Sequence, residues 1–302
     1  MANRIKIANE TIQIIRDGGY DFDGKHVEFV KKDYYDVEVY RPKRLEDMVQ
    51  EAGEKISENA DLYSNGMQQK NEQSDGIQYG QGENGTNTRN KTINDVISVI
   101  DSDSFEAAKD YHENILVMNF ANAQVPGGGF RMGATAQEEL LCRNSTLYAS
   151  IKSDKASEMY RYNMSHPSAI PSAYMLLSPN VYVFRDSKCR LLEQPFKVSV
   201  ITLPAPNRNG LAVFTGREKI ANVMKERIRM MLAVAMEHGY ETLILGAWGC
   251  GAFGHTAENV AGYFKEVLLD EGYVKVFKNI VFAIYHGDRD GKCDVFRNIL
   301  RK

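Results

Sequence analysis

Residues 114–139 read NILVMNFANAQVPGGGFRMGATAQEE. The first seven are almost all apolar, which predicts a β-strand that is buried on both faces. Gly127, Gly128 and Gly129 follow in a loop, and a helical pattern begins near residue 136. In open α/β sheets, ligands bind at the carboxyl ends of the strands. Glu138 and Glu139, just beyond such an end, therefore lie where a ligand is expected.

Apolar strand patterns alternate with helical patterns through the rest of the chain. This alternation predicts an α/β protein in which helices cover both faces of one sheet. Strands are predicted at 26–30, 36–40, 95–100, 114–120, 180–184, 197–203, 241–248 and 279–285. Helices are predicted at 5–15, 45–59, 104–112, from about 136, and at 217–238, 256–270 and 290–300.

The segment 64–91 differs from its surroundings in composition. Gly, Asn and Gln make up more than half of it, and apolar side chains are nearly absent. Such a segment cannot offset its ordering entropy by burial, which predicts a flexible linker or insertion. The chain is therefore expected to have three parts: an N-terminal extension at 1–63 that packs on the catalytic domain, the linker at 64–91, and the catalytic domain at 92–302.

The composition is that of a globular protein of ordinary polarity. Among the 302 residues, 43% are hydrophobic, 25% are charged, and the formal net charge is −3. That charge argues against a broad DNA-binding face. The four cysteines form no C-x-x-C pair, so we expect free thiols, no metal site and a cytoplasmic location. Neither a signal-peptide core nor a membrane-spanning apolar run is visible, so no membrane partner is expected.

A second glycine-rich stretch, GAWGCGAFG at 246–254, follows the apolar TLIL. A glycine turn between a strand and a helix exposes backbone N–H groups at the positive end of the helix dipole, which suits a phosphate or diphosphate. Residues 249–254 also satisfy G-x-G-x-x-G, the dinucleotide-binding fingerprint. No acidic residue closes a following strand about twenty positions later, which argues against a Rossmann oxidoreductase. Each loop alone can be a simple turn, but both can also face one crevice.

The two carboxylates have different interpretations. Thr135 and Glu138 fit the S/T-x-x-E capping box, so Glu138 can be a helix cap. Glu139 is not explained by that motif. The helix dipole lowers its pKa, and a proton donor there needs an opposing influence, such as a second carboxylate or a bound diphosphate.

These motifs resemble those of poly(ADP-ribose) glycohydrolases. The resemblance rests on GGG followed after seven residues by QEE, and on the later GAWGCGAFG. The segments NFANA at 119–123, PAPN at 204–207 and the N-terminal ANETIQIIRDGGY are also similar to the compact bacterial-type branch. The likeness spans most of the chain except 64–91. It implies a macrodomain-like mixed sheet between helices, with a helical N-terminal extension.

The resemblance also implies an activity, a substrate and site residues. The enzyme would hydrolyse ribose–ribose O-glycosidic bonds of poly(ADP-ribose) and release ADP-ribose with no cofactor. Its partner would be the polymer or an ADP-ribosylated protein. Glu139 would be the general acid and then the base. Glu138 would position the ribose. The remaining implied binding residues are Gln137, which supports the pair, Asn122 near the distal ribose, Gly127, Gly128 and Gly129, and Gly249, Cys250, Gly251, Ala252, Phe253 and Gly254 around the diphosphate, with Phe253 packed on the terminal ADP-ribose.

Two other functions remain open at this point. A macrodomain can bind ADP-ribose without cleaving it, or can remove single ADP-ribose units from a protein or nucleic acid. Two residues near the second loop also have alternatives. His255 is expected at the surface rather than on a phosphate. Cys250 is expected to be a small packing residue rather than a thiol whose pKa the helix dipole lowers. His112, His166, His238 and His286 are interpreted as isolated surface or structural residues.

Overall fold

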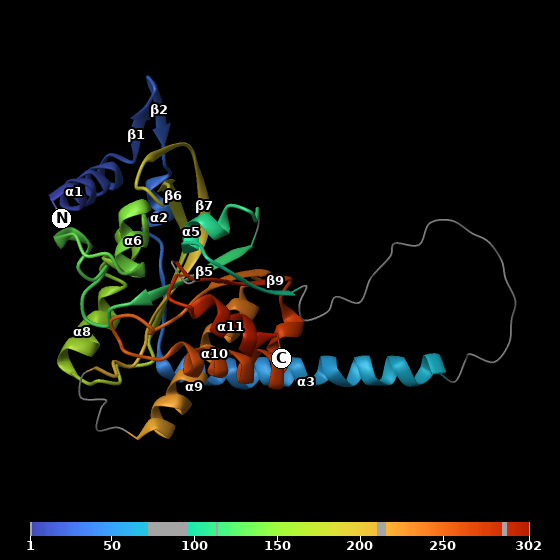
Figure 1. The fold of residues 1–302 in the computed structure, drawn as a ribbon. Helices are drawn as coiled ribbons and strands as arrows, with labels where there is room; N and C mark the ends of the chain where they lie inside the picture. The colour runs from blue at the N-terminus through green and yellow to red at the C-terminus, as the bar shows by residue number, and fades with distance from the viewer. Residues whose placement is uncertain (1, 72–95, 113, 210–215, 286–288, 302) are drawn as a thin grey trace, which may run out of the picture.

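A computed structural model describes residues 2–71, 96–112, 114–209, 216–285 and 289–301 (Figure 1). Within these residues, seven strands form one sheet in the order β3-β6-β7-β5-β8-β9-β4. Their bounds are β3 Glu38–Tyr40, β4 Ile97–Ile100, β5 Ile115–Ala121, β6 Met175–Arg185, β7 Leu191–Pro204, β8 Thr242–Leu245 and β9 Asn279–Ala283. From β7 to β4 the neighbours pair in parallel, whereas β6 and β3 are antiparallel. The sheet is therefore mixed.

Alternate side chains of β5 enter separate cores on the two faces of the sheet. Leu116 and Met118 belong to the larger core, and Ile115 and Val117 to the second. Successive side chains of a strand point to opposite faces, so both faces of β5 are covered. This burial explains why the strand is apolar without alternation.

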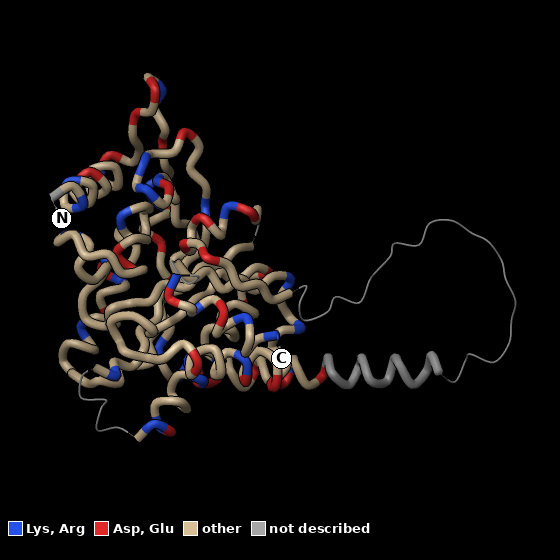
Figure 2. Tube along the Cα trace, viewed as in Figure 1, with Lys and Arg blue, Asp and Glu red and all other residues tan. Residues whose placement is uncertain are grey.

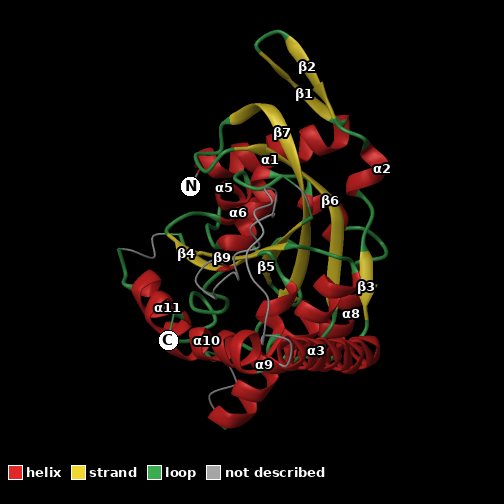
Figure 3. Ribbon diagram, turned by 90° about the vertical axis from the view of Figure 1, so that its right-hand side faces the viewer, coloured by secondary structure: helices red, strands yellow, loops and turns green. Residues whose placement is uncertain are grey.

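Helices cover both faces of this sheet (Figure 3). The larger core is closed by α3 Pro42–Asn71, α9 Arg217–Glu237, α10 Ala257–Lys265 and α11 Lys292–Leu300. The opposite face is closed by α1 Ala2–Asp17, α5 Ser104–Ala108, α6 Gln137–Asn144, α7 Leu147–Ile151 and α8 Ser157–Ser165. Short turns of helix complete the set: η1 Phe130–Met132, η3 Glu266–Asp270 and η4 Tyr273–Val276. The predicted mixed sheet between helices, with a helical N-terminal segment, is confirmed.

The N-terminal segment enters the sheet through β3. Before it, β1 Gly19–Phe22 and β2 Lys25–Glu28 form a hairpin, and α2 Lys31–Tyr34 follows. The sequence interpretation missed β1, because it is short and follows directly on the glycines that end α1. Aromatic rings then fix the segment to β6: Phe29 stacks on Tyr182 with ring centroids 4.8 Å apart. This packing depends on residues about 150 positions apart.

Helix α3 is longer than predicted. The sequence interpretation ended it at residue 59, whereas its backbone stays helical to Asn71. It therefore includes the first eight residues of the expected linker, where Met, Gln and Lys are good helix formers. Residues 72–91 of that linker lie outside the described residues, and the three-part division of the chain stays a prediction. None of the described helices is long and apolar enough to cross a membrane.

Candidate functional site

The two glycine loops border one cleft at the carboxyl ends of β5 and β8. The cleft has a volume of about 530 Å³; the second loop lines it with residues 249–253, and the first contributes Asn122. Several residues singled out from the sequence line it: Asn122, Gln137, Glu138, Glu139, Gly249, Cys250, Gly251, Ala252 and Phe253. Gly127, Gly128, Gly129 and Gly254 are not among the lining residues. Gly128 and Gly129 lie instead against the carboxylate of Glu139. A cleft of this size suits a nucleotide-like ligand.

Glu139 lies in the first turn of α6 with its carboxylate almost fully buried. Its Oε1 accepts a hydrogen bond from the N–H of Gly129 at 2.9 Å. Its Oε2 is buried and has no partner among the described residues. One oxygen is thus held by the first glycine loop. The other is free to exchange a proton with a ligand in the cleft.

Glu138 is held more completely. Its Oε2 accepts the Asn122 N–H at 2.7 Å, and its Oε1 accepts from Asn119 Nδ2 at 3.4 Å. Burial raises the pKa of Glu138 to about 8, against the opposing influence of these hydrogen bonds. The side chain is therefore fixed against the loop after β5, and the Glu138 carboxyl group keeps its proton near neutral pH.

Gln137 joins the start of α6 to the end of β5. Its Oε1 accepts the Phe120 N–H at 2.9 Å, and its Nε2 donates to Met118 O at 2.7 Å. The amide satisfies backbone groups at the point where the strand leaves the sheet. Gln137 therefore fixes the orientation of the helix that carries the two glutamates.

The capping-box interpretation of Glu138 is wrong. The N-cap of α6 is Ala136, and no side chain caps that helix. The helix begins one residue later than the box requires, so Glu138 is its second residue and not its third. Its oxygens accept hydrogen bonds from Asn122 and Asn119 instead. The tertiary contact with the β5 loop replaces the local one.

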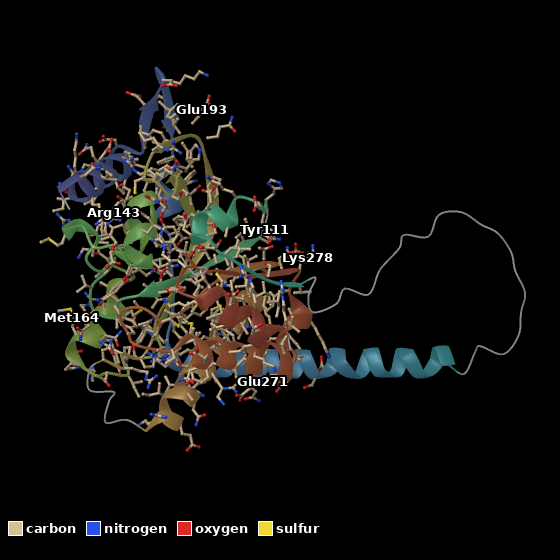
Figure 4. The ribbon with its side chains drawn as sticks, in the orientation of Figure 1. Tyr111, Arg143, Met164, Glu193, Glu271 and Lys278 are labelled. Atoms are coloured by element: carbon tan, nitrogen blue, oxygen red, sulfur yellow. The ribbon has the colours of Figure 1, made fainter. Side chains whose placement is uncertain are left out.

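Arg143, near the end of α6, holds the segment that leads into this helix, and Figure 4 labels it beside α6. Its guanidinium is buried and donates to Ala134 O at 2.6 Å. The backbone oxygen of Arg143 accepts from Thr11 Oγ1 of α1 at 2.7 Å. Helix α1 is thereby tied to the helix that carries the glutamates.

The second loop contains two glycines with different roles. Gly249 has φ +79°, and a Cβ there would lie 2.8 Å from His255 Cδ2. Gly251 has open space where a Cβ would stand, and it lines the cleft. Gly249 is therefore needed for the turn. Gly251 instead leaves the backbone accessible from the cleft.

The expected surface position of His255 is wrong. Its side chain is buried, and its Nε2 lies 2.8 Å from Pro206 O. Close to Pro206, the backbone N–H of Arg208 donates to the backbone oxygen of Phe253 in the second loop at 2.9 Å. The PAPN segment thus supports the second loop from behind, a contact between residues about fifty positions apart.

The structure also decides the state of the cysteine in this loop. Burial raises the pKa of Cys250 to about 12. The alternative of a pKa lowered by the helix dipole is therefore wrong, and the side chain is a neutral thiol. Among the other histidines, His238 is not isolated, because its Nε2 lies 2.5 Å from Tyr40 Oη. His286 lies outside the described residues.

Sequence reasoning missed the acidic residue at the other wall of the cleft. Asp103 Oδ1 caps α5 by accepting from the N–H groups of Phe105 and Glu106, both at 3.0 Å. Its Oδ2 is buried without a partner among the described residues, and Asp103 lines the cleft. An Asp that follows a strand and precedes a helix is a visible N-cap signal, but its second oxygen becomes significant only in the assembled cleft. Arg4 and Lys292, from opposite ends of the chain, also line this cleft.

A mixed sheet of this order, with two glycine loops and adjacent glutamates around one cleft, defines a macrodomain-like α/β protein. The chain belongs to the microbial-type PARG (poly(ADP-ribose) glycohydrolase) family: the model of that family's catalytic domain matches residues 8–186. No curated protein gives a significant match.

Solved structures of two bacterial poly(ADP-ribose) glycohydrolases are similar to the whole fold. The enzyme from Thermomonospora curvata is 31% identical, with a TM-score of 0.81, and the match covers 99% of this chain and 100% of that one. The same enzyme bound to the inhibitor ADP-HPD is 30% identical, with a TM-score of 0.80 and 99% coverage of both chains. The Deinococcus radiodurans enzyme in complex with ADP-ribose is 30% identical, with a TM-score of 0.71, covering 89% of this chain and 96% of that one.

Proposed function

We propose that this protein hydrolyses the ribose–ribose O-glycosidic bonds of poly(ADP-ribose) and releases ADP-ribose. The observation that carries the proposal is the carboxylate of Glu139. One of its oxygens is held by the Gly129 N–H, and the other is buried beside the cleft with no partner in the described part of the chain. A carboxylic acid fixed at one oxygen and free at the other is suited to proton transfer to a bound glycosidic oxygen.

The reaction follows from that geometry. Glu139 donates its proton from Oε2 to the departing ribose oxygen as the bond to the anomeric carbon breaks, which leaves an oxocarbenium-like centre. Glu139, now a carboxylate, removes a proton from the water that attacks this carbon. The released ADP-ribose carries the hydroxyl from that water, and Glu139 regains its proton. The adjacent Glu138 serves to position the ribose hydroxyls. Its own orientation is fixed, because its oxygens accept hydrogen bonds from Asn119 and Asn122.

The other walls of the cleft fit the remaining parts of ADP-ribose. Gly251, with its open backbone, faces the diphosphate, and Phe253 packs against the terminal ribose near Asn122. The unpartnered Oδ2 of Asp103 is an acceptor for the exocyclic amino group of adenine. Arg4 and Lys292 add positive charge to a cleft that takes a ligand with two phosphates.

The test is release of ADP-ribose from labelled polymer. The wild-type protein should produce free ADP-ribose, and Glu139→Gln should bind ADP-ribose yet turn over about 10² to 10⁴ times more slowly. Turnover close to wild type in Glu139→Gln would exclude that residue as the acid. Binding without cleavage by the wild type would favour a non-hydrolytic reader. Cleavage limited to single protein-linked units would favour a mono-ADP-ribosyl hydrolase.

We also propose a cytoplasmic location and ADP-ribosylated proteins as partners, without a DNA-binding face. None of the four cysteines, all of which the structure describes, forms a disulfide, which is typical of a reducing compartment. In the view of Figure 2, Lys and Arg positions are interspersed with Asp and Glu rather than gathered in one region. The first observation supports the cytoplasmic location, and the second supports the lack of a DNA-binding face.

A further inference from the structure

A smaller groove of about 150 Å³ adjoins the cleft at Asn122 and Phe253, which line both. Its other walls come from the loop after β5, from the segment that follows α8 and from the PAPN segment. Most of its lining side chains are polar, including Gln124, His166 and Asn207. The groove therefore begins beside the position proposed for the terminal ribose and leads away from the adenine end of the cleft.

Buried side chains hold the groove open. Asn163 of α8 donates from Nδ2 to Ala123 O at 3.2 Å and accepts the Ser172 N–H at 2.8 Å. On the other side, the buried guanidinium of Arg227 donates to Pro204 O at 2.6 Å and also to Pro171 O. Both walls are thus fixed to the fold by hydrogen bonds of buried side chains. The groove is a preformed feature rather than a gap between loops.

A flat aromatic surface stands at the edge of the groove. His166 lines the groove, and its ring stacks on Tyr162 with centroids 4.3 Å apart and planes 18° apart. Tyr162 is in turn packed against Tyr174, at 5.3 Å between centroids, yet 42% of its surface is exposed. Exposed rings held in a fixed orientation are the usual platform for a nucleobase.

Beyond the groove lies a third hollow that shares Gln124 with it. Lys152 and Arg161 line this hollow, as does Met164, which Figure 4 shows at the outer edge of α8. Two cations beside a solvent-facing hollow suit a diphosphate. The groove therefore adjoins flat rings through His166 and a positively charged hollow through Gln124.

From this arrangement we infer that the groove and the Tyr162–His166 platform bind the adenosine of the second unit of the polymer, and that Lys152 and Arg161 face its diphosphate. The inference rests on the proposed function. The bond that Glu139 would cleave joins the terminal ribose to the adenosine ribose of the next unit. The group that departs is therefore an adenosine followed by a diphosphate, and the groove adjoins both a ring platform for the base and a charged hollow for the phosphates.

The test uses Glu139→Gln, which holds the polymer uncleaved, and compares the affinities for ADP-ribose and for a defined dimer of ADP-ribose. The dimer should bind at least about tenfold more tightly, because stacking of one base on an aromatic ring has a substantial effect on affinity. Adding Tyr162→Ala or His166→Ala should remove about tenfold of dimer affinity and leave ADP-ribose affinity unchanged. Adding Lys152→Ala should weaken the salt dependence of dimer binding alone.

Two matched variants control for loss of a ring. Tyr162→Phe keeps the stacking surface and should bind the dimer as tightly as the parent. Tyr35→Ala removes a similarly exposed ring, 47% exposed, from the N-terminal segment, and should have no effect. Equal affinities for dimer and monomer would overturn the inference, even if the wild type releases ADP-ribose from polymer. Tight dimer binding by a wild-type protein that releases no ADP-ribose would support the groove and contradict the proposed function instead.

Discussion

Gly128 and Glu139 approach each other so closely that no side chain fits between them. A Cβ at residue 128 would lie 2.4 Å from Glu139 Oε1, and the backbone there has φ +51°. The neighbouring Gly129 N–H holds the same oxygen at 2.9 Å. The triple glycine therefore has a defined purpose: it lets the main chain pass directly against the carboxylate and donate to it. This contact answers why three glycines precede a pair of glutamates.

Gly128→Ala should lower turnover by at least about 10²-fold, because the new methyl group displaces the carboxylate from the Gly129 N–H. Stability should fall by only about 1–2 kcal/mol, the usual cost of a left-handed backbone for an L residue. Gly239→Ala is the matched control, since φ is +67° there and nothing lies within 4 Å of the added Cβ. Polymer cleavage and thermal melting of both variants are the measurements. Equal turnover in the two variants would mean that backbone strain, and not the carboxylate contact, explains the glycine.

Glu138→Gln should become more stable relative to wild type as the pH rises. The unfolded carboxyl loses its proton near 4.5, whereas in the folded protein its pKa is about 8. Between these values the folded state binds more protons, so wild-type stability falls as pH rises through this window. The variant lacks this group. The difference in unfolding free energy should therefore grow by at least about 1 kcal/mol between pH 5 and pH 8.5.

Denaturant unfolding at the two pH values measures that difference. Glu218→Gln, at an exposed position in the first turn of α9, is the control and should show little change. A pH-independent difference for Glu138→Gln would contradict the raised pKa.

Gly251→Val should weaken ADP-ribose binding without loss of stability, because its side chain would project into open space that lines the cleft. Gly216→Val is a matched control, since its Cβ also meets nothing within 4 Å and it does not line the cleft. Calorimetric titration of ADP-ribose and a melting curve for each variant separate the two effects. An unchanged affinity in Gly251→Val would remove the second loop from the site.

Shortening the segment 72–91 by about ten residues should leave the melting temperature and turnover unchanged. The segment is polar and of low complexity, so its removal takes little apolar burial from the protein. Helix α3 is left intact to Asn71 in this variant. A fall of several degrees in melting temperature would show that the segment packs against the fold.

The sequence by itself determined both glycine loops and most of the alternation of strands and helices, although it missed β1 and the short helices α2, α7 and α8. A continuous apolar strand such as 114–120, followed by glycines and a helix start, permits few folds. This motif is recognisable in the sequence because periodicity and turn chemistry depend on residues that are close together in the chain. The adjacency of Glu138 and Glu139 at that helix start was visible for the same reason. Element ends were less predictable, as the extension of α3 to Asn71 shows.

Only the tertiary structure decided how these residues work. His255 lies buried against Pro206, Glu138 turns to Asn122, and Asp103 contributes an unpartnered oxygen to the cleft. Each outcome depends on a contact or a burial that arises when distant segments meet. The local sequence pattern does not reveal these contacts, because the free energy of a buried polar group is set by its neighbours in space. Sequence therefore identified the glutamates and the second loop of the site, whereas packing brought Asp103 into the cleft and determined the orientation and partners of the others.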